Sequence, residues 1–235
     1  MKSKKIFLIG EKSINEELKT LLNDKAEFVQ KPDNETDIIV DTLNGETSLK
    51  IANIQFIDKH CSSQIPVFTS SVCHPVSELC AISSYPKRLI GIGLYNTFSN
   101  SKLLEIAPSK ISDETILQNA ENFLKDAGLT FAKVPDRAGL VFPRIISMII
   151  NEAVQVYSEK VASKEDIDTA MKLGTNYPYG PLEWADKLGI DLVYQILSSL
   201  QKNYGEDRYR PHPTLKEMVD LNMLGVKTGK GFYNW

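Results

Sequence analysis

The segment Lys5-Ile-Phe-Leu-Ile-Gly10 sets the fold class of this chain, because a short apolar run ends on a glycine. Such a run is typical of a strand buried in a sheet. Apolar residues then recur at helical spacing over residues 14–22, at Ile14, Leu18, Leu21 and Leu22. A buried strand, a turn and an amphipathic helix in this order predict an α/β fold with a parallel, doubly wound sheet.

The same alternation continues to about residue 135. Further short strands are expected at residues 27–30, 37–43, 66–69, 89–95, 103–106 and 130–134. A helix is expected over residues 112–127, with Ser112 as its N-cap and Gly128 as its end. Residues 53–60 are ambiguous by pattern alone. Residues 1–135 are therefore predicted to form one α/β domain.

After residue 135 the apolar residues recur only at helical spacing. Helices are expected at residues 141–157, 182–188 and 191–204, the last of them ended by Gly205. Another helix is expected to open at the capping box Ser163-Lys-Glu-Asp166 and to end at Gly174. Residues 136–235 are therefore predicted to form an all-helical domain.

Composition narrows the class of protein. The net charge of −3 over 235 residues argues against non-specific binding to nucleic acid. No segment approaches the roughly 20 apolar residues of a membrane helix, and the N-terminus lacks the pattern of a signal peptide. The cysteines Cys61, Cys73 and Cys80 show no zinc-binding spacing. We expect a cytoplasmic protein with reduced thiols and no metal ion.

The second half carries an ordered series of motifs. They are Asp136-Arg-Ala-Gly139, Asn151-Glu-Ala153, Glu165-Asp-Ile-Asp168, Tyr179-Gly-Pro-Leu-Glu183, Pro211-His-Pro213 and Lys227-Thr-Gly-Lys-Gly-Phe-Tyr233. In this order they resemble the L-3-hydroxyacyl-CoA dehydrogenase family, with a looser match over residues 37–134. The resemblance implies a Rossmann-like domain that binds NAD, a helix starting near Thr47, and a helical domain that lines an acyl-CoA cleft and forms a homodimer.

The family's catalytic positions are altered in this chain. The segment Arg88-Leu-Ile-Gly-Ile-Gly-Leu-Tyr-Asn96 resembles the strand that carries the family's catalytic histidine, and Gly93 stands in the histidine's place. Glu105 matches the glutamate that orients this histidine. The slots of a substrate-binding serine and asparagine hold Val72 and Pro143. Removing a general base costs roughly 10²–10⁴-fold in rate, so these substitutions predict a loss of hydride transfer.

The alternative to a loss of hydride transfer is a base supplied from another position in the chain. His74 follows Val72 at the expected carboxyl end of a strand, where α/β folds bind ligands. His74 paired with Glu105 would be the candidate for such a rescue.

The cofactor positions are also changed. A dinucleotide-binding turn uses three glycines, and their slots here hold Gly10, Lys12 and Asn15. Lys12 would crowd a pyrophosphate, although its charge could attract phosphate. Asn15 would push the helix off the strand unless it finds a partner. Gly10 by itself is expected to turn the chain.

The other residues of the expected cofactor site match the family only in part. Lys50 and Asn96 match residues that contact NAD in the family, although Lys50 considered alone is expected to be a solvated helix residue. Gln30 or Lys31 falls where a carboxylate would bind the ribose. Only residues 31–36 connect the second and third strands, too few for the usual parallel crossover. We therefore expect a sheet that is reduced or rewired there.

Three functions follow from these observations. The first is a non-catalytic acyl-CoA-related binding or partner protein. The second is a working NAD-dependent 3-hydroxyacyl-CoA dehydrogenase, such as a 3-hydroxybutyryl-CoA dehydrogenase of fatty-acid metabolism, with a relocated base. The third is an enzyme of another class, for which the sequence offers no motif.

Overall fold

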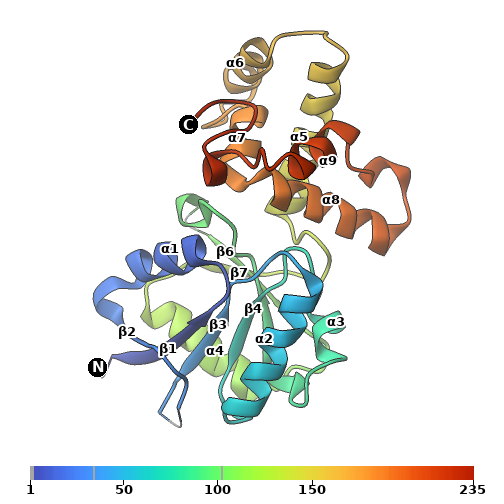
Figure 1. Ribbon diagram of the computed structural model, residues 1–235. Helices are drawn as coiled ribbons and strands as arrows, with labels where there is room; N and C mark the ends of the chain where they lie inside the picture. The colour runs from blue at the N-terminus through green and yellow to red at the C-terminus, as the bar shows by residue number, and fades with distance from the viewer. Residues whose placement is uncertain (1–2, 34, 102) are drawn as a thin grey trace. The chain divides into compact units, whose positions relative to one another are not determined.

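The computed structural model describes residues 3–33, 35–101 and 103–235 (Figure 1). Two compact units divide the chain, Met1–Leu140 and Val141–Trp235. The boundary lies between Leu140 and the first helix of the second unit, later than the division after residue 135 that the sequence suggested.

The first unit is built on a seven-stranded sheet with the order β2-β1-β3-β4-β5-β6-β7. The strands are β1 (Lys4–Ile9), β2 (Ala26–Val29), β3 (Ile38–Asp41), β4 (Val67–Ser70), β5 (Leu89–Ile92), β6 (Leu104–Pro108) and β7 (Phe131–Lys133). All neighbouring strands are parallel except β5 and β6, which are antiparallel. The prediction of a Rossmann-like sheet is confirmed. The antiparallel pairing of β5 with β6 interrupts its parallel order, so β6 and β7 run opposite to β1–β5.

Four of the connections between these strands contain an α-helix. The helices are α1 (Lys12–Leu22), α2 (Thr47–His60), the short α3 (Val76–Cys80) and α4 (Glu114–Asp126). One core layer joins Phe7 of β1, Ile39 of β3 and Val67 of β4 to Ile54 and Ile57 of α2. Burial of such side chains is the main source of stability in a layer of this kind.

The connection between β2 and β3 crosses β1, and its described residues form no helix. Both strands are parallel to β1 and pair with its opposite edges. The crossing segment returns to the start of β1, where the Asp37 N–H donates to the Lys5 carbonyl at 2.9 Å. The Lys5 N–H in turn donates to the Asp37 carboxylate at 2.9 Å. The short connection thus forms a parallel crossover after all, made of irregular chain instead of the usual helix.

Two predicted helix ends were wrong by a residue or more. The N-cap of α4 is Asp113, not Ser112, because the Asp113 carboxylate accepts from the N–H groups of Thr115 and Ile116. Gly174 lies inside α6 (Lys164–Thr175), and Asn176 takes the left-handed conformation after it, with φ 57°. Asparagine tolerates this conformation better than most residues.

The second unit is all-helical, as predicted. Besides α6 it contains α5 (Phe142–Ser158), α7 (Pro181–Leu188), α8 (Ile190–Tyr204) and α9 (Pro213–Asp220). Pro143 is buried in the first turn of α5, where a missing N–H costs little. None of the described helices is long and apolar enough to cross a bilayer.

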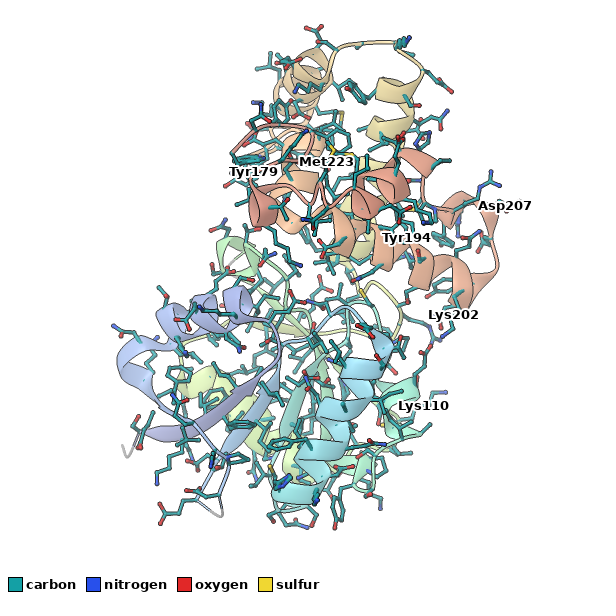
Figure 2. All side chains as sticks on the ribbon, in the orientation of Figure 1. Lys110, Tyr179, Tyr194, Lys202, Asp207 and Met223 are labelled. Carbon is teal, nitrogen blue, oxygen red and sulfur yellow. The ribbon has the colours of Figure 1, made fainter. Side chains whose placement is uncertain are left out.

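The C-terminal segment is held by one buried carboxylate. Asp186 of α7 is fully buried and accepts from the N–H groups of Phe232 and Tyr233, at 2.9 and 2.8 Å, and from the Trp235 indole at 2.9 Å. Lys187 then lies over the rings of Tyr179 and Trp235. Tyr179 is labelled in Figure 2. The last residues of the chain are therefore fastened to α7, with Phe232 buried and Trp235 still 48% exposed.

Candidate functional site

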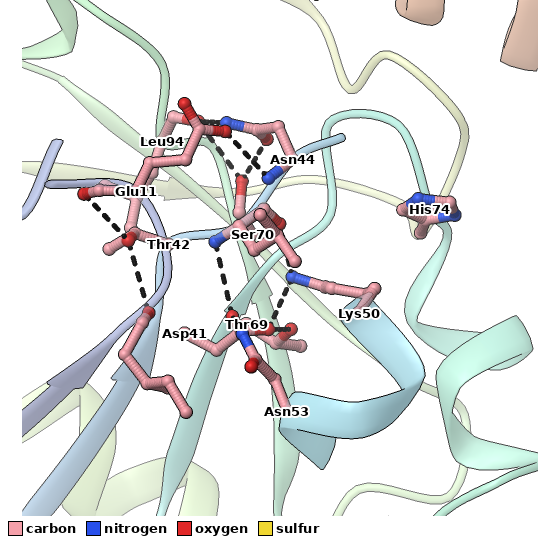
Figure 3. A network of polar contacts seen from close by, with 12 residues as sticks. Glu11, Asp41, Thr42, Asn44, Lys50, Asn53, Thr69, Ser70, His74 and Leu94 are labelled. Atoms are coloured by element: carbon pink, nitrogen blue, oxygen red, sulfur yellow. Dashed lines mark hydrogen bonds and ion pairs between the residues drawn. The ribbon is translucent and has the colours of Figure 1, made fainter. Parts of the chain in front are cut away.

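The candidate site lies at the carboxyl ends of β1, β3 and β4. The strand order reverses direction between β1 and β3, since β2 lies on one side of β1 and β3 to β5 on the other. Open α/β sheets bind ligands outside the carboxyl ends of their strands where the strand order reverses. The place between the carboxyl ends of β1 and β3 is called the crevice below. Polar side chains gather there into the network shown in Figure 3.

A buried ion pair forms the base of this network. Nζ of Lys50 lies 2.6 Å from Oδ2 of Asp41 and donates to the Leu43 carbonyl at 2.7 Å. The same carboxylate accepts from Thr69 at 2.8 Å and from Asn53 at 2.9 Å. Lys50 is fully buried, so the expectation of a solvated helix residue was wrong.

Burial also changes the acidity of Lys50. Desolvation lowers the pKa of Lys50 from its usual 10.5, and the nearby carboxylates of Asp41 and Glu11 oppose that shift. The position at the start of α2 turns the lysine toward the end of β3. Lys50 is thus engaged within the protein instead of extending into solvent.

Asn44 is the centre of the upper part of the network. Its N–H donates to Oε1 of Glu11 at 3.1 Å, and its side-chain amide donates to the Leu94 carbonyl at 2.8 Å. The Ser70 hydroxyl donates to the Asn44 side-chain oxygen at 2.6 Å. Asn44, only 1% exposed, therefore ties together the segments after β1, β3 and β5 and the end of β4.

The turn after β1 contains the three slots of the glycine motif. Gly10 has φ 118°, and a Cβ there would lie 2.5 Å from the Leu43 nitrogen, so this position requires glycine. Lys12 is exposed as the first residue of α1. Asn15 does find a partner, because the Thr42 hydroxyl donates to its side-chain oxygen at 2.7 Å. The helix is held to the sheet by this polar pair.

Asn96 lies where the segment after β5 meets α1. The Ser13 hydroxyl donates to the Asn96 side-chain oxygen at 2.9 Å. One turn along α1, the Glu17 carboxylate accepts from the N–H groups of Thr97 at 3.0 Å and Ser99 at 2.9 Å. Thr97 has φ 73°, an unfavourable value for a β-branched residue. The carboxylate of Glu17 holds this strained segment in place.

Gly93 and Glu105 lie side by side. The Gly93 N–H donates to the Glu105 carbonyl at 2.8 Å. A Cβ built on Gly93 would lie 3.6 Å from Cβ of Glu105 and 3.2 Å from Cδ1 of Leu140. A side chain at position 93 would therefore emerge beside Glu105, and the Leu140 side chain borders that space.

The neighbouring positions after β4 offer little polar chemistry. Nε2 of His74 lies 3.0 Å from the Gly45 carbonyl, which can only accept, so Nε2 carries a hydrogen in this contact. Val72 is fully buried, as expected of an apolar side chain. The Ser71 hydroxyl is buried and has no hydrogen-bond partner among the residues that the structure describes, and a Cβ at Gly91 would lie 2.5 Å from it. That hydroxyl faces β5.

No pattern in the sequence pointed to two central residues of the network, Glu11 and Asn44. Both are ordinary polar residues in predicted turns. Asp41 carried a weak signal, because a carboxylate directly after the apolar run Ile38-Ile-Val40 must find partners at the end of its strand. Within the described parts of the chain, no group of three or more histidine, cysteine or acidic residues could hold a metal ion.

A Rossmann-like sheet followed by an all-helical unit defines the class of this protein. Residues 9–137 match the family model "3-hydroxyacyl-CoA dehydrogenase, NAD binding domain", and residues 139–235 match "3-hydroxyacyl-CoA dehydrogenase, C-terminal domain". The chain belongs to the 3-hydroxyacyl-CoA dehydrogenase family.

Named relatives agree with this assignment. A 3-hydroxybutyryl-CoA dehydrogenase of Clostridioides difficile is 32% identical over 199 residues, which cover 85% of this chain and 71% of that protein. A 3-hydroxybutyryl-CoA dehydrogenase of Bradyrhizobium diazoefficiens is 29% identical over 229 residues, covering 97% and 78% of the two chains.

Solved structures share the fold. FadB2 of M. tuberculosis superposes with a TM-score of 0.85 at 18% identity. The (S)-3-hydroxybutyryl-CoA dehydrogenase PaaH1 of Ralstonia eutropha superposes with a TM-score of 0.81 at 24% identity. In both comparisons 99% of each chain is covered.

Proposed function

We propose that this member of the family does not transfer hydride and instead serves as an acyl-CoA-related binding or partner protein. The observation that carries the proposal is Gly93. Oxidation of a hydroxyl requires a base within hydrogen-bond reach of its proton, and the family resemblance assigns that role to the side chain that Gly93 lacks. Glu105 remains beside the vacated position, with its Cβ 3.6 Å from the place where a Cβ of residue 93 would be.

The remaining parts of the proposal follow from the family. The helical unit would form a homodimer, the ligand would be an acyl-CoA or a related thioester, and the protein would reside in the cytoplasm. NAD is the cofactor that the matched domain suggests.

A second candidate is an NAD-dependent 3-hydroxybutyryl-CoA dehydrogenase with a relocated base. The names of the relatives favour it. His74 would have to replace the missing base, with Glu105 as its partner. Its contact with the Gly45 carbonyl would then have to be exchanged for one with substrate.

Turnover distinguishes the two candidates. Purified protein is incubated with NADH and acetoacetyl-CoA, and NADH oxidation is followed by absorbance; the reverse reaction uses NAD and 3-hydroxybutyryl-CoA. We expect no turnover above the blank at micromolar protein. Turnover that disappears in both His74→Gln and Glu105→Gln would establish the second candidate and overturn the first.

Binding and assembly are measured separately. Titration calorimetry with acetoacetyl-CoA and butyryl-CoA is expected to show saturable binding, and sedimentation at micromolar concentration is expected to show a dimer. A protein that binds neither thioester would exclude the acyl-CoA role. A monomer in sedimentation would exclude the homodimer.

A further inference from the structure

The segment after β1 places a carboxylate at the start of α1, in the crevice between β1 and β3. Glu11 directly precedes α1 and follows Gly10, whose backbone is packed against the segment after β3. Its side chain does not cap its own helix. Instead, Oε1 of Glu11 accepts the Asn44 N–H from across the crevice.

Asn44 keeps this carboxylate in place. The side-chain nitrogen and oxygen of Asn44 are engaged with Leu94 and Ser70, and Asn44 is almost entirely buried. If the Glu11 side chain swung away, the Asn44 N–H would lose its protein acceptor. A buried donor without an acceptor is costly, so the carboxylate is stabilised where it lies (Figure 3).

A dinucleotide needs this turn to be free of negative charge. Its pyrophosphate is an anion that binds to the free N–H groups at a helix N-terminus, where the helix dipole favours negative charge. A carboxylate fixed at the same terminus repels that anion. The side chain of Lys12 adds bulk at the point where close approach to the backbone calls for glycine. The residues present therefore do not fit a dinucleotide pyrophosphate.

We propose that Glu11 is the specificity-determining residue that excludes dinucleotides from the crevice between β1 and β3. This inference is independent of the missing base at Gly93, because a protein without the base could still bind NADH. It concerns binding at the cofactor turn, whereas the proposed function concerns turnover and the thioester.

The test compares NADH binding by wild-type protein and two variants. Glu11→Gln removes the charge and keeps an oxygen that can accept the Asn44 N–H, whereas Glu11→Ala removes both. The matched control is Glu16→Gln, which neutralises a mostly exposed carboxylate on the same helix, paired with Lys19. NADH fluorescence is titrated, with ADP-ribose as a second probe that has the pyrophosphate and no nicotinamide. Circular dichroism checks that every variant is folded.

We expect weak or undetectable binding of NADH and ADP-ribose by the wild type and by Glu16→Gln. At least one Glu11 variant should bind both probes roughly tenfold more tightly. The gain is expected because the variant removes either the negative charge of Glu11 or the side chain that the Asn44 N–H holds in place. A tighter affinity in Glu11→Ala alone would mean that the Glu11 side chain excludes the dinucleotide by occupying its place. A tighter affinity in both variants would mean that its negative charge excludes the dinucleotide. Saturable NADH binding by the wild type with the affinity of the variants would overturn the inference. So would the absence of any gain in both Glu11 variants.

Discussion

The ammonium nitrogen of Lys50 lies 2.6 Å from Oδ2 of Asp41, with only 1% and 0% of the two side chains exposed. The pair links the first turns of α2 to the end of β3. Thr69, Asn53 and the Leu43 N–H also donate to this carboxylate, so neither charge is buried alone. The pair lies at the base of the polar network at the carboxyl ends of β1, β3 and β4.

Removing the lysine should therefore be costly. Lys50→Met leaves the Asp41 carboxylate buried without its counter-charge, and we expect the free energy of unfolding to fall by about 3–5 kcal/mol. Urea denaturation followed by circular dichroism measures this change. Lys19→Met is the control, because 40% of the Lys19 side chain is exposed and it pairs with the surface carboxylate of Glu16. That variant should differ from the wild type by less than about 0.5 kcal/mol, and equal losses in both would contradict the prediction.

The same pair predicts a dependence on alkaline pH. Burial lowers the pKa of Lys50 in the folded protein below 10.5, the value of an unperturbed lysine. Between the lowered pKa and 10.5, the unfolded chain binds a proton that the folded chain does not. Raising the pH through this window therefore favours folding. The free energy of unfolding of the wild type minus that of Lys50→Met should increase from neutral pH toward pH 10.5, and a flat or falling difference would argue against the lowered pKa.

Asp186 should be as important in the helical unit as Asp41 is in the sheet. Asp186→Asn replaces an acceptor of three N–H groups by an amide with a single acceptor oxygen, which leaves buried donors unsatisfied. We expect a loss of about 2–4 kcal/mol in the free energy of unfolding and faster hydrogen exchange at Phe232 and Tyr233. Asp220→Asn is the matched control on an exposed carboxylate. If exchange at the C-terminus were unchanged, the role assigned to Asp186 would be wrong.

Thr97 offers a test in the stabilising direction. Its φ of 73° strains a β-branched side chain, while the contacts of its N–H with Glu17 keep the backbone there. Glycine adopts this conformation without strain, so Thr97→Gly should raise the free energy of unfolding by up to about 1 kcal/mol. Thr20→Gly, in the last turn of α1, should instead lower it, by less than about 1 kcal/mol. A destabilising Thr97→Gly would show that the threonine side chain makes a contact worth more than the strain.

The sequence was sufficient for the elements with a strong periodic pattern. The strands around Ile6, Ile39 and Ile90 and the long helix that contains Ile150 were predictable, because burial of one face leaves a regular apolar spacing. The crossover between β2 and β3 was less predictable. Its course depends on pairing with both edges of β1, which no local pattern encodes.

The site was predictable only where a family resemblance pointed to it. Gly93 and Glu105 could be singled out as a matched pair of slots, and the structure brings them together. Lys50 was misjudged because a lysine in a helix is usually solvated, and its burial follows from the carboxylate at the end of β3. Glu11 acquires its place from Asn44 across the crevice, a tertiary contact that spacing does not show.

The space beside Gly93 gives the last prediction. A Cβ at this position would meet Cδ1 of Leu140 at 3.2 Å, tighter than an ordinary contact, whereas its other neighbours lie at ordinary distances. Gly93→His therefore requires the Leu140 side chain to move, and we expect a loss of about 1–3 kcal/mol in the free energy of unfolding. Leu140→Ala alone should cost about 2–5 kcal/mol, because it opens a cavity in a buried place. In the double variant the histidine can use the space that the leucine leaves, so its total loss should be smaller than the sum by about 0.5–3 kcal/mol. Urea denaturation of the four proteins completes the cycle. Strictly additive losses would mean that a side chain at position 93 does not enter the space bordered by Leu140, and would remove the structural basis for regarding that space as the place of the missing base.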